Sequence, residues 1–281
     1  MTSLSASYRA CAQITREASS TFSLSAWLFD RDTRRSIQAL YAFCRTADNI
    51  ADSSKLTIRQ KQAGLRALRT ALTSQQPAKI AADMWPALFH TMKNHNLPVA
   101  ELDIILDGVS SDIGFRQPLT IGELDRYSFK VAGIVGVLSA RILGGYKKST
   151  LEGAKQLGIA MQYTNIIRDV AEDLTIGRIY IPQSSLREAG LTIEDLKAHQ
   201  NQAGLQRALE ILTKRADSYY DHALPAVKEL HPSYQKPVLA AAGLYRHILE
   251  RIKQKQYTVY DSRIRLSRLE KLQLVWRIYH P

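Results

Sequence analysis

The chain has 281 residues, 45% of them hydrophobic, and a formal net charge of +12. Such a chain can bury one large core, and because it has no stretch rich in Ser, Gly and Pro, we expect one domain over residues 1–281. Two cysteines, Cys11 and Cys44, exclude a disulfide scaffold and a cysteine-rich zinc site, which favours a reducing compartment.

No apolar run approaches the ~18 residues that a membrane-spanning helix needs, and the N-terminal sequence lacks the apolar centre of a signal peptide. We therefore expect a cytoplasmic protein, peripheral if it contacts a membrane at all. The excess of Lys and Arg suits a polyanionic partner, such as a phosphorylated small molecule, an anionic membrane or a nucleic acid. It is equally consistent with a well-solvated basic surface.

Apolar residues recur with helical period along nearly the whole chain. In chain order, this pattern predicts helices at 5–28, 34–53, 57–73, 79–95, 99–113, 121–143, 150–174, 203–230, 233–256 and 264–278. Proline and glycine separate several of them, and the short run GRIYIP at 177–182 is the one extended candidate. The fold expected is therefore all-α, a bundle of helices around a central space.

The predicted helix at 34–53 carries a polar stripe between apolar neighbours. Its members follow one another at steps of four, three and four residues, which places them on one helical face: Tyr41, Arg45, Asp48 and Asp52. Two aspartates one turn apart repel each other and weaken a helix, so either solvent or a cation should offset that repulsion.

A second stripe lies on the predicted helix at 150–174, in the run MQYTNIIRDVAED. Its members also share one face: Gln162, Asn165, Asp169 and Asp173. Such stripes are either wet helix faces or the lining of an interior cavity, where carboxylates need cations. Oxygen-only ligands suit Mg²⁺, which binds carboxylates together with substrate phosphates. Arg45 and Arg168 would add positive charge for the same diphosphate.

These motifs resemble the squalene/phytoene synthase family, whose members join two prenyl diphosphates head to head. The first aspartate-rich motif of the family is similar to LYAFCRTADNIAD at 40–52, and its longer second signature is similar to QYTNIIRDVAEDLTIGRIYIP at 162–182. Three further stretches resemble the family in the same order along the chain: SSTF at 19–22, YSFKVAGIVG at 127–136 and LYRHILERIKQKQYTVYDSR at 244–263.

The resemblance implies an isoprenoid-synthase-type bundle around an apolar cavity, and it implies roles for particular residues. The residues that would bind Mg²⁺, with Mn²⁺ as the alternative ion, are Asp48, Asp52, Asp169, Asp173 and Asn165. The residues that would contact the diphosphates are Arg45, Arg168, Arg178, Gln162, Asn165, Ser19 and Thr21. The residues that would lie near the reacting carbons or the leaving group are Tyr41, Arg45, Tyr127 and Tyr257.

Three positions depart from the family pattern. Asn49 replaces an aspartate that many members have in the first motif, but the outer aspartates remain, so we expect metal binding to remain. Phe129 stands where many bacterial members have a second tyrosine, which leaves no phenol for that position. Thr21 replaces a common serine in the stretch at 19–22, which resembles a serine-containing flap of the family. Gly133 and Gly136 would let a prenyl tail pass close to the backbone, or serve helix packing.

The activity implied is condensation through a cyclopropyl-bearing diphosphate, with two geranylgeranyl diphosphates giving phytoene as the first choice. The alternative starts from farnesyl diphosphate and gives presqualene diphosphate, dehydrosqualene or squalene, and squalene alone would require NADPH. No Gly-x-Gly-x-x-Gly fingerprint for a nicotinamide cofactor is present, which argues weakly against squalene.

Two rival functions remain. A non-catalytic assembly protein of the same fold would have lost some of the motif aspartates, and this chain keeps them. A nucleic-acid binder would cluster its basic residues with stacking aromatics, and this chain does not. We therefore expect no nucleic-acid partner. The tail at 261–280 forms a basic amphipathic pattern that would suit an anionic membrane or pack on the bundle, and Arg263 and Arg265 in it would reach a diphosphate.

Overall fold

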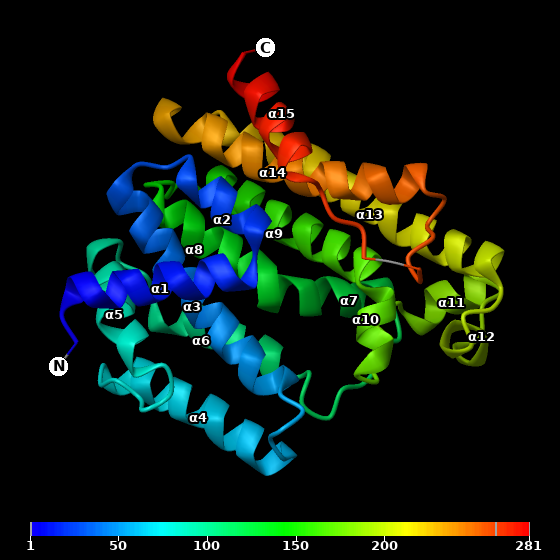
Figure 1. Cartoon of the computed structure of the whole chain (residues 1–281), viewed down its shortest axis with the longest axis horizontal. Coiled ribbons are helices and arrows are strands. Elements are labelled where there is room, and N and C mark those ends of the chain that lie inside the picture. The colour runs from blue at the N-terminus through cyan, green and yellow to red at the C-terminus, as the bar shows by residue number, and fades with distance from the viewer. Residues whose placement is uncertain (1, 262, 281) are drawn as a thin grey trace.

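The computed structural model describes residues 2–261 and 263–280, and within these ranges the chain is helical with no β-strand (Figure 1). The fold prediction is therefore confirmed. The helices are α1 (Leu4–Ala18), α2 (Ser20–Trp27), α3 (Arg31–Asp52), α4 (Ile58–Ser74), α5 (Trp85–Asn94), α6 (Val99–Ser110), α7 (Ile121–Ser128), α8 (Ile134–Ile142), α9 (Lys148–Arg168), α10 (Val170–Thr175), α11 (Gln183–Ala189), α12 (Ile193–Lys197), α13 (Gln202–Val227), α14 (Pro232–Gln254) and α15 (Arg268–Tyr279).

Three of the predicted helices are interrupted or shortened, each for a local reason. The helix expected at 5–28 breaks at Ser19, whose extended backbone ends α1 and whose Oγ accepts a hydrogen bond from the Phe22 amide at the start of α2. The helix expected at 79–95 starts only at Trp85, because Ala81 has a positive φ of 48°. The helix at 150–174 pauses at Asp169.

The helix expected at 121–143 is continuous but contains a π turn over Phe129–Gly133, between α7 and α8. A π turn inserts one residue and rotates the helical face that follows it. As a result, Tyr127 before the turn and Gly136 after it both border the central cavities described below.

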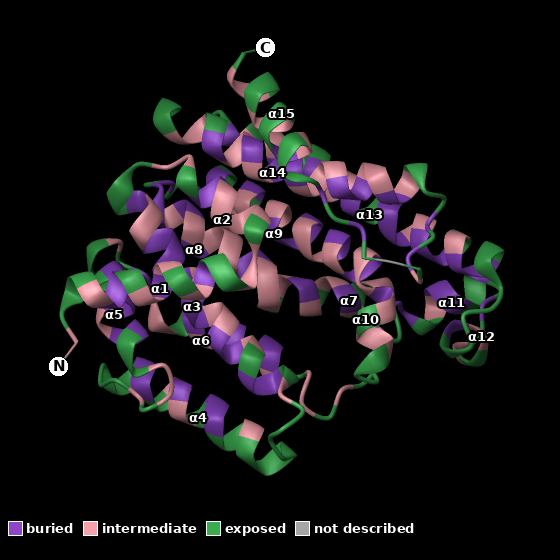
Figure 2. Ribbon diagram, in the orientation of Figure 1, coloured by how far each residue is buried: buried purple, intermediate pink, exposed green. Residues whose placement is uncertain are grey.

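Helix α9 lies at the centre of the bundle and packs against α8, α13 and α14 (Figure 1). Its contact with α8 is made backbone to backbone, because a Cβ on Gly136 would lie 2.1 Å from the Ala154 carbonyl oxygen and one on Gly158 would lie 2.3 Å from that of Ala132. These two glycines therefore serve helix packing, and the helices around α9 turn their buried faces toward it (Figure 2).

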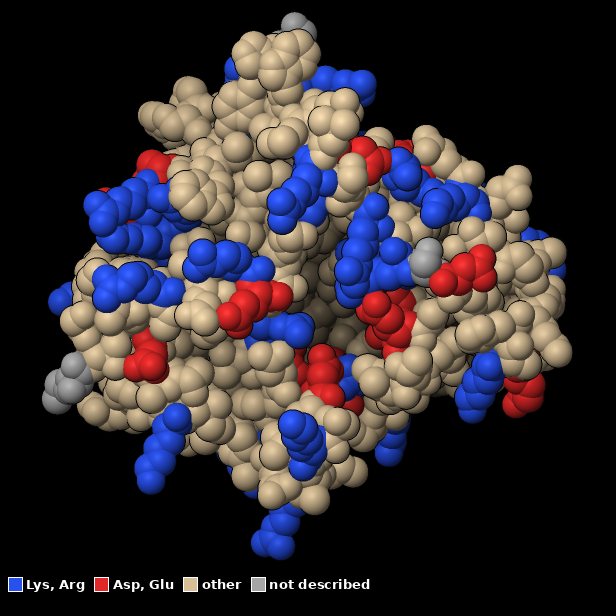
Figure 3. Space-filling view, viewed as in Figure 1, with Lys and Arg blue, Asp and Glu red and all other residues tan. Residues whose placement is uncertain are grey.

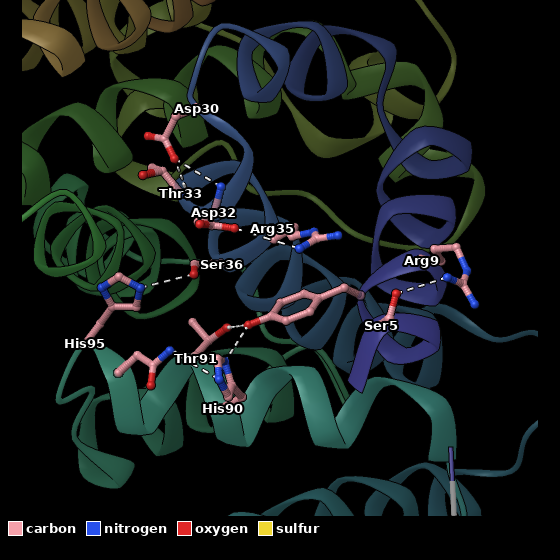
Figure 4. A network of polar contacts seen from close by, with 12 residues as sticks. Ser5, Arg9, Asp30, Asp32, Thr33, Arg35, Ser36, His90, Thr91 and His95 are labelled. Atoms are coloured by element: carbon pink, nitrogen blue, oxygen red, sulfur yellow. Dashed lines mark hydrogen bonds and ion pairs between the residues drawn. The ribbon is translucent and has the colours of Figure 1, made fainter. Parts of the chain in front are cut away.

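Side-chain hydrogen bonds around the N-terminal half of α3 join α3 to the end of α5, and α5 to α1 (Figure 4). Ser36 on α3 lies 3.1 Å from Nε2 of His95, and the Tyr8 hydroxyl on α1 lies 3.0 Å from Nδ1 of His90. Thr33 on α3 also contacts the Tyr234 hydroxyl of α14 at 3.2 Å. These contacts fix the axis of α3, and with it the direction of the stripe at its other end.

Among the residues described, no helix combines the length and the apolar character needed to cross a bilayer.

Candidate active site

The two acidic stripes line one polar cavity, whose mouth is the central hollow rimmed by acidic and basic side chains in Figure 3. The first stripe comes from α3, and the second comes from the end of α9 and from α10. The residues expected in the site that border this cavity are Ser19, Thr21, Tyr41, Arg45, Asp48, Asp52, Tyr127, Gln162, Asn165, Arg168, Asp169, Asp173 and Arg178. Residues far apart in the chain are thus brought together around one space.

The second stripe keeps its direction although the helix pauses at Asp169. The Asp169 amide donates to the Asn165 carbonyl at 2.8 Å, and the Asp173 amide donates to the Asp169 carbonyl at the same distance. Because helical hydrogen bonds continue on both sides of the pause, the side chains four residues apart still face one way.

Arginine side chains hold two of the four aspartates. Arg178, itself buried, donates to Asp52 at 2.6 Å and thereby links the loop after α10 to the end of α3. Asp169 receives both Arg168, at 2.6 and 2.5 Å, and Arg263 of the C-terminal segment, at 2.9 Å. Arg263, which was expected to reach a diphosphate, borders the cavity and pairs with this carboxylate, and its contact with a diphosphate stays a prediction.

The side-chain carboxylates of the other two aspartates, Asp48 and Asp173, have no hydrogen-bond or ion-pair partner among the residues described. Burial, together with the neighbouring Asp52, raises the pKa of Asp48 to about 7. Burial, together with Asp169, raises the pKa of Asp173 to about 8. A carboxylate that is buried without a cation costs free energy, so each stripe contains one group that a cation would stabilise.

A further carboxylate of the cavity, Asp112, was missed by the assignment of site residues. It follows α6, in the polar run at 107–115, which the sequence assigns either to the mouth of the pocket or to a loop, and it borders the same cavity. Its oxygens accept hydrogen bonds from the Tyr127 hydroxyl at 3.0 Å and the Tyr180 hydroxyl at 2.8 Å. Burial raises the pKa of Asp112 to about 6, and burial also raises the pKa of Tyr127 far above its ordinary value.

Positive groups reach the cavity from both ends of the chain. Lys271 of α15 is buried and donates a 2.8 Å hydrogen bond to the Ser20 hydroxyl at the start of α2, and it forms no ion pair with a described residue. Burial lowers the pKa of this lysine. Arg45 and Arg265 also border the cavity without a carboxylate partner among the described residues. The site therefore holds cationic groups that are available to an anion.

An apolar cavity continues from the polar one along α3. Tyr41, Asp48, Gln162 and Asn165 border both spaces, as does Tyr245 of α14, which the sequence reading did not select. The apolar walls are built largely from small residues: Ala26, Ala132, Gly136, Ala140, Gly153, Ala154, Gly158, Ala223 and Ala226. The far end is closed by larger apolar residues: Phe29, Leu143, Leu230 and Val238.

Tyr257 does not lie in the site, so its expected role there is corrected. Its backbone and that of Gln256 have positive φ values of 57° and 49°, and this reversal after α14 turns the ring into the core beside Thr213 of α13. Gly133 is likewise absent from the cavity wall and packs against Ile159, whereas Gly136 does border it.

The residues fit a divalent cation that shares its coordination with a ligand. In the part of the chain that is described, no three carboxylate, imidazole or thiol groups gather closely enough to hold a metal ion alone. The available donors are oxygens, two per stripe, and Asp48 and Asp173 are unpaired. This donor set suits Mg²⁺, which takes one or two carboxylates and completes its shell with water and phosphate oxygens.

The geometry defines a class of protein: an all-helical bundle with a polar site, lined by aspartates and arginines, that opens into an apolar cavity. The model of the squalene/phytoene synthase family matches residues 15–270 of this chain. The phytoene synthase of Pseudescherichia vulneris is 33% identical over 94% of this chain and 88% of its own length. The 15-cis-phytoene synthase of Enterobacter agglomerans is 34% identical over 92% and 90%.

Solved structures agree. A dehydrosqualene synthase in complex with ligand superposes with a TM-score of 0.90 at 30% identity, covering 98% of this chain and 96% of that chain. The squalene synthase HpnC from Alicyclobacillus acidocaldarius has the same fold, with a TM-score of 0.81 at 24% identity over 90% and 95%. The chain belongs to the squalene/phytoene synthase family and is a prenyltransferase.

Proposed function

We propose that this enzyme condenses two geranylgeranyl diphosphates head to head, through a cyclopropyl-bearing diphosphate, to phytoene. The observation that carries the proposal is the direct opening of the charged cavity into the apolar one, shared by Tyr41, Asp48 and Asn165. A prenyl diphosphate has the same two parts, a charged head and a hydrocarbon tail. The similarity to two phytoene synthases supports the choice of product.

The four aspartates are the proposed metal ligands, with Asp48 and Asp52 on one side and Asp169 and Asp173, supported by Asn165, on the other. Magnesium, or manganese in its place, would neutralise charge on the leaving diphosphate. Arg178 and Arg168, which donate to Asp52 and Asp169, line the same polar cavity. They therefore add donors for the diphosphate oxygens once the head of the substrate is bound.

The residues of the chain itself lower the barrier by fixed positive charge. As the carbon–oxygen bond breaks, negative charge gathers on the diphosphate, and Arg45, Arg178 and Lys271 are placed at the cavity before that charge develops. The carbocation left behind passes aromatic faces: the Tyr41 ring stacks on Phe22 with centroids 4.2 Å apart. The apolar walls exclude the water that would quench it.

A second candidate activity uses farnesyl diphosphate and gives presqualene diphosphate, dehydrosqualene or, with NADPH, squalene. The close superposition on a dehydrosqualene synthase supports this second candidate activity. The small residues along the apolar walls favour the longer substrate, because they leave the cavity open as far as Phe29 and Leu143. With either substrate the product is a water-insoluble hydrocarbon or its diphosphate precursor, so the proposal places the enzyme in the cytoplasm at a membrane surface.

One assay tests the proposal. The purified enzyme is incubated with Mg²⁺ and either geranylgeranyl or farnesyl diphosphate, with and without NADPH, and the extracted lipid is identified by mass spectrometry. Phytoene from geranylgeranyl diphosphate is expected. Product from farnesyl diphosphate alone would replace the first candidate with the second, and no diphosphate release from either substrate would reject both and favour a non-catalytic role.

A further inference from the structure

Helix α15 has two apolar faces, and the bundle covers one of them. On the covered face, Ile278 packs against Gly243 of α14, and Leu274 and Val275 join the core. The opposite face exposes a stripe, which we call the α15 stripe, formed by Leu269, Leu272 and Trp276, with 65%, 58% and 61% of their surfaces accessible. Steps of three and four residues place these side chains on one side of the helix.

Basic residues flank the α15 stripe on both sides. Arg268 and Arg277 lie about 80–100° around the helix axis from the stripe, one toward each edge. Neither forms an ion pair with a carboxylate of the described residues, and the single acidic residue of the helix, Glu270, pairs with Arg251 of α14. In Figure 3, the uncharged surface at the top of the view lies over α15 and has basic side chains at its edges. An apolar stripe with arginines beside it suits the interface of an anionic bilayer.

The same helix is attached to the wall of the apolar cavity. It packs along α14 and is tied to α2 by the hydrogen bond from Lys271 to Ser20. The cavity wall on this side consists of Phe22 of α2, Phe29 just after α2, and Val238 and Tyr245 of α14. Exposed Trp27, at the end of α2, adds an aromatic side chain next to this wall, with 64% of its surface accessible.

We propose that the α15 stripe binds the surface of an anionic bilayer and holds the α2–α14 wall of the apolar cavity against it, so that the hydrocarbon product passes between α2 and α14 into lipid. The product step rests on the proposed function, whereas the binding of the stripe to lipid does not. Within the described residues, the polar contacts on this side are at the start of α2, where Ser19 contacts Tyr245 of α14 and Ser20 accepts from Lys271 of α15. The opening for the product therefore lies toward the other end of α2, where Ala26 and Phe29 line the cavity.

A second copy of the chain is the other occupant to consider. Three exposed side chains on one twelve-residue helix form a small patch, whereas a stable dimer buries about 800 Å² on each partner. A second copy would also bring the unpaired Arg268 and Arg277 close to a chain with a net charge of +12. An anionic lipid surface pairs with those arginines, and we therefore commit to the bilayer.

The binding step is tested by co-sedimentation with vesicles of phosphatidylcholine, alone or mixed with phosphatidylglycerol. Wild-type enzyme should bind the mixed vesicles, and the triple variant Leu269→Ser/Leu272→Ser/Trp276→Ser should bind about tenfold more weakly or worse. The matched control is Leu56→Ser/Ile58→Ser, which removes two exposed apolar side chains beside α4 and should bind like wild type. The double variant Arg268→Gln/Arg277→Gln should lose the preference for phosphatidylglycerol.

The release step is tested by measuring diphosphate release in the absence of detergent, first over a single turnover and then over many turnovers. Wild type and the triple variant should release diphosphate equally in the first turnover, but mixed vesicles should stimulate only the wild type thereafter. A triple variant that binds vesicles like wild type, or a wild type that binds none, would overturn the inference. So would a wild-type dimer in solution that the triple substitution dissociates, since the stripe would then join two copies. If the wild-type enzyme released no diphosphate even in the first turnover, the result would instead count against the proposed function.

Discussion

The guanidinium of Arg178 donates a 2.6 Å hydrogen bond to the carboxylate of Asp52, joining segments that lie 126 residues apart in the chain. The bond connects the loop after the second acidic stripe to the last turn of the first. The backbone amide of Arg178 also donates to the Asp173 carbonyl at 2.8 Å. One residue therefore sets the position of both stripes, and its substitution should disturb the whole head site.

Arg178→Gln should reduce turnover by about 10²–10³, because it removes a fixed positive charge from the leaving group and frees Asp52. Diphosphate release at saturating Mg²⁺ measures the effect. Arg187→Gln, on the exposed side of α11, is the control and should retain wild-type turnover. Turnover within about twofold of wild type for Arg178→Gln would show that this arginine has no role in the head site.

Asp48→Asn should separate stability from activity. The substitution removes a carboxylate that burial disfavours, so the metal-free protein should melt on the order of 3 °C higher at about pH 8. The same change removes a proposed metal ligand and should lower turnover by about 10² or more. Differential scanning calorimetry and diphosphate release give the two readings. Near-normal turnover of both Asp48→Asn and Asp169→Asn would contradict the metal assignment.

The metal-free protein should lose stability as the pH rises from about 5 to about 8. An unfolded aspartate titrates near pH 3.9, whereas Asp48 and Asp173 in the folded protein have pKa values of about 7 and about 8. Between these limits the folded state binds more protons, so raising the pH favours unfolding. Mg²⁺ removes that penalty, and the rise in Tm on adding it should be larger at about pH 8 than at about pH 6.

The double variant Asp48→Asn/Asp173→Asn is the control for this pH dependence. It lacks the two groups with the most strongly raised pKa values and keeps only Asp112, whose pKa is about 6, so its Tm should fall less over the same interval and change little above about pH 7. Its Tm should also respond weakly to Mg²⁺. If wild type and the double variant gave the same response to Mg²⁺ at both pH values, the ion would be bound elsewhere.

Ala140→Phe should shorten the usable length of the apolar cavity. Ala140 borders that cavity one turn before Leu143, which helps to close its far end. A ring at this position occupies the space that a longer tail needs, so kcat/KM for geranylgeranyl diphosphate should fall about tenfold or more, with a smaller loss for farnesyl diphosphate. Ala140→Ser is the control of similar size. Equal losses of kcat/KM for both substrates would show that this wall does not determine the length of the prenyl chain that the enzyme accepts.

Much of the head site could be predicted from the sequence, because helical geometry fixes which side chains share a face. The spacing of Asp48 and Asp52 alone predicts that they share one face of α3. Asn165, Asp169 and Asp173 also share one face, although the helix is interrupted at Asp169. The facing of the two stripes and the roles of individual residues needed the family resemblance, since periodicity says nothing about which helices meet.

The residues that were missed or misplaced depend on contacts between distant segments. Lys271 enters the site through a hydrogen bond to Ser20, 251 residues away, and Asp112 is recognisable only once Tyr180 is seen to hold it. Tyr257 was misplaced because the chain reverses after α14 at Gln256 and Tyr257, which both have left-handed backbone conformations. Neither residue is a glycine, so the sequence contains no signal of this turn.

The backbone contact between α8 and α9 limits how this enzyme can change. Where Gly136 and Gly158 border the hydrocarbon cavity, the wall is already peptide with no side chain to trim. These two positions can neither be trimmed nor enlarged, because an added Cβ would collide with a carbonyl oxygen of the neighbouring helical segment. Descendants that accept bulkier chains must therefore gain room by shortening larger side chains of the cavity, such as Leu157 and Met161 of α9 or Val238 of α14.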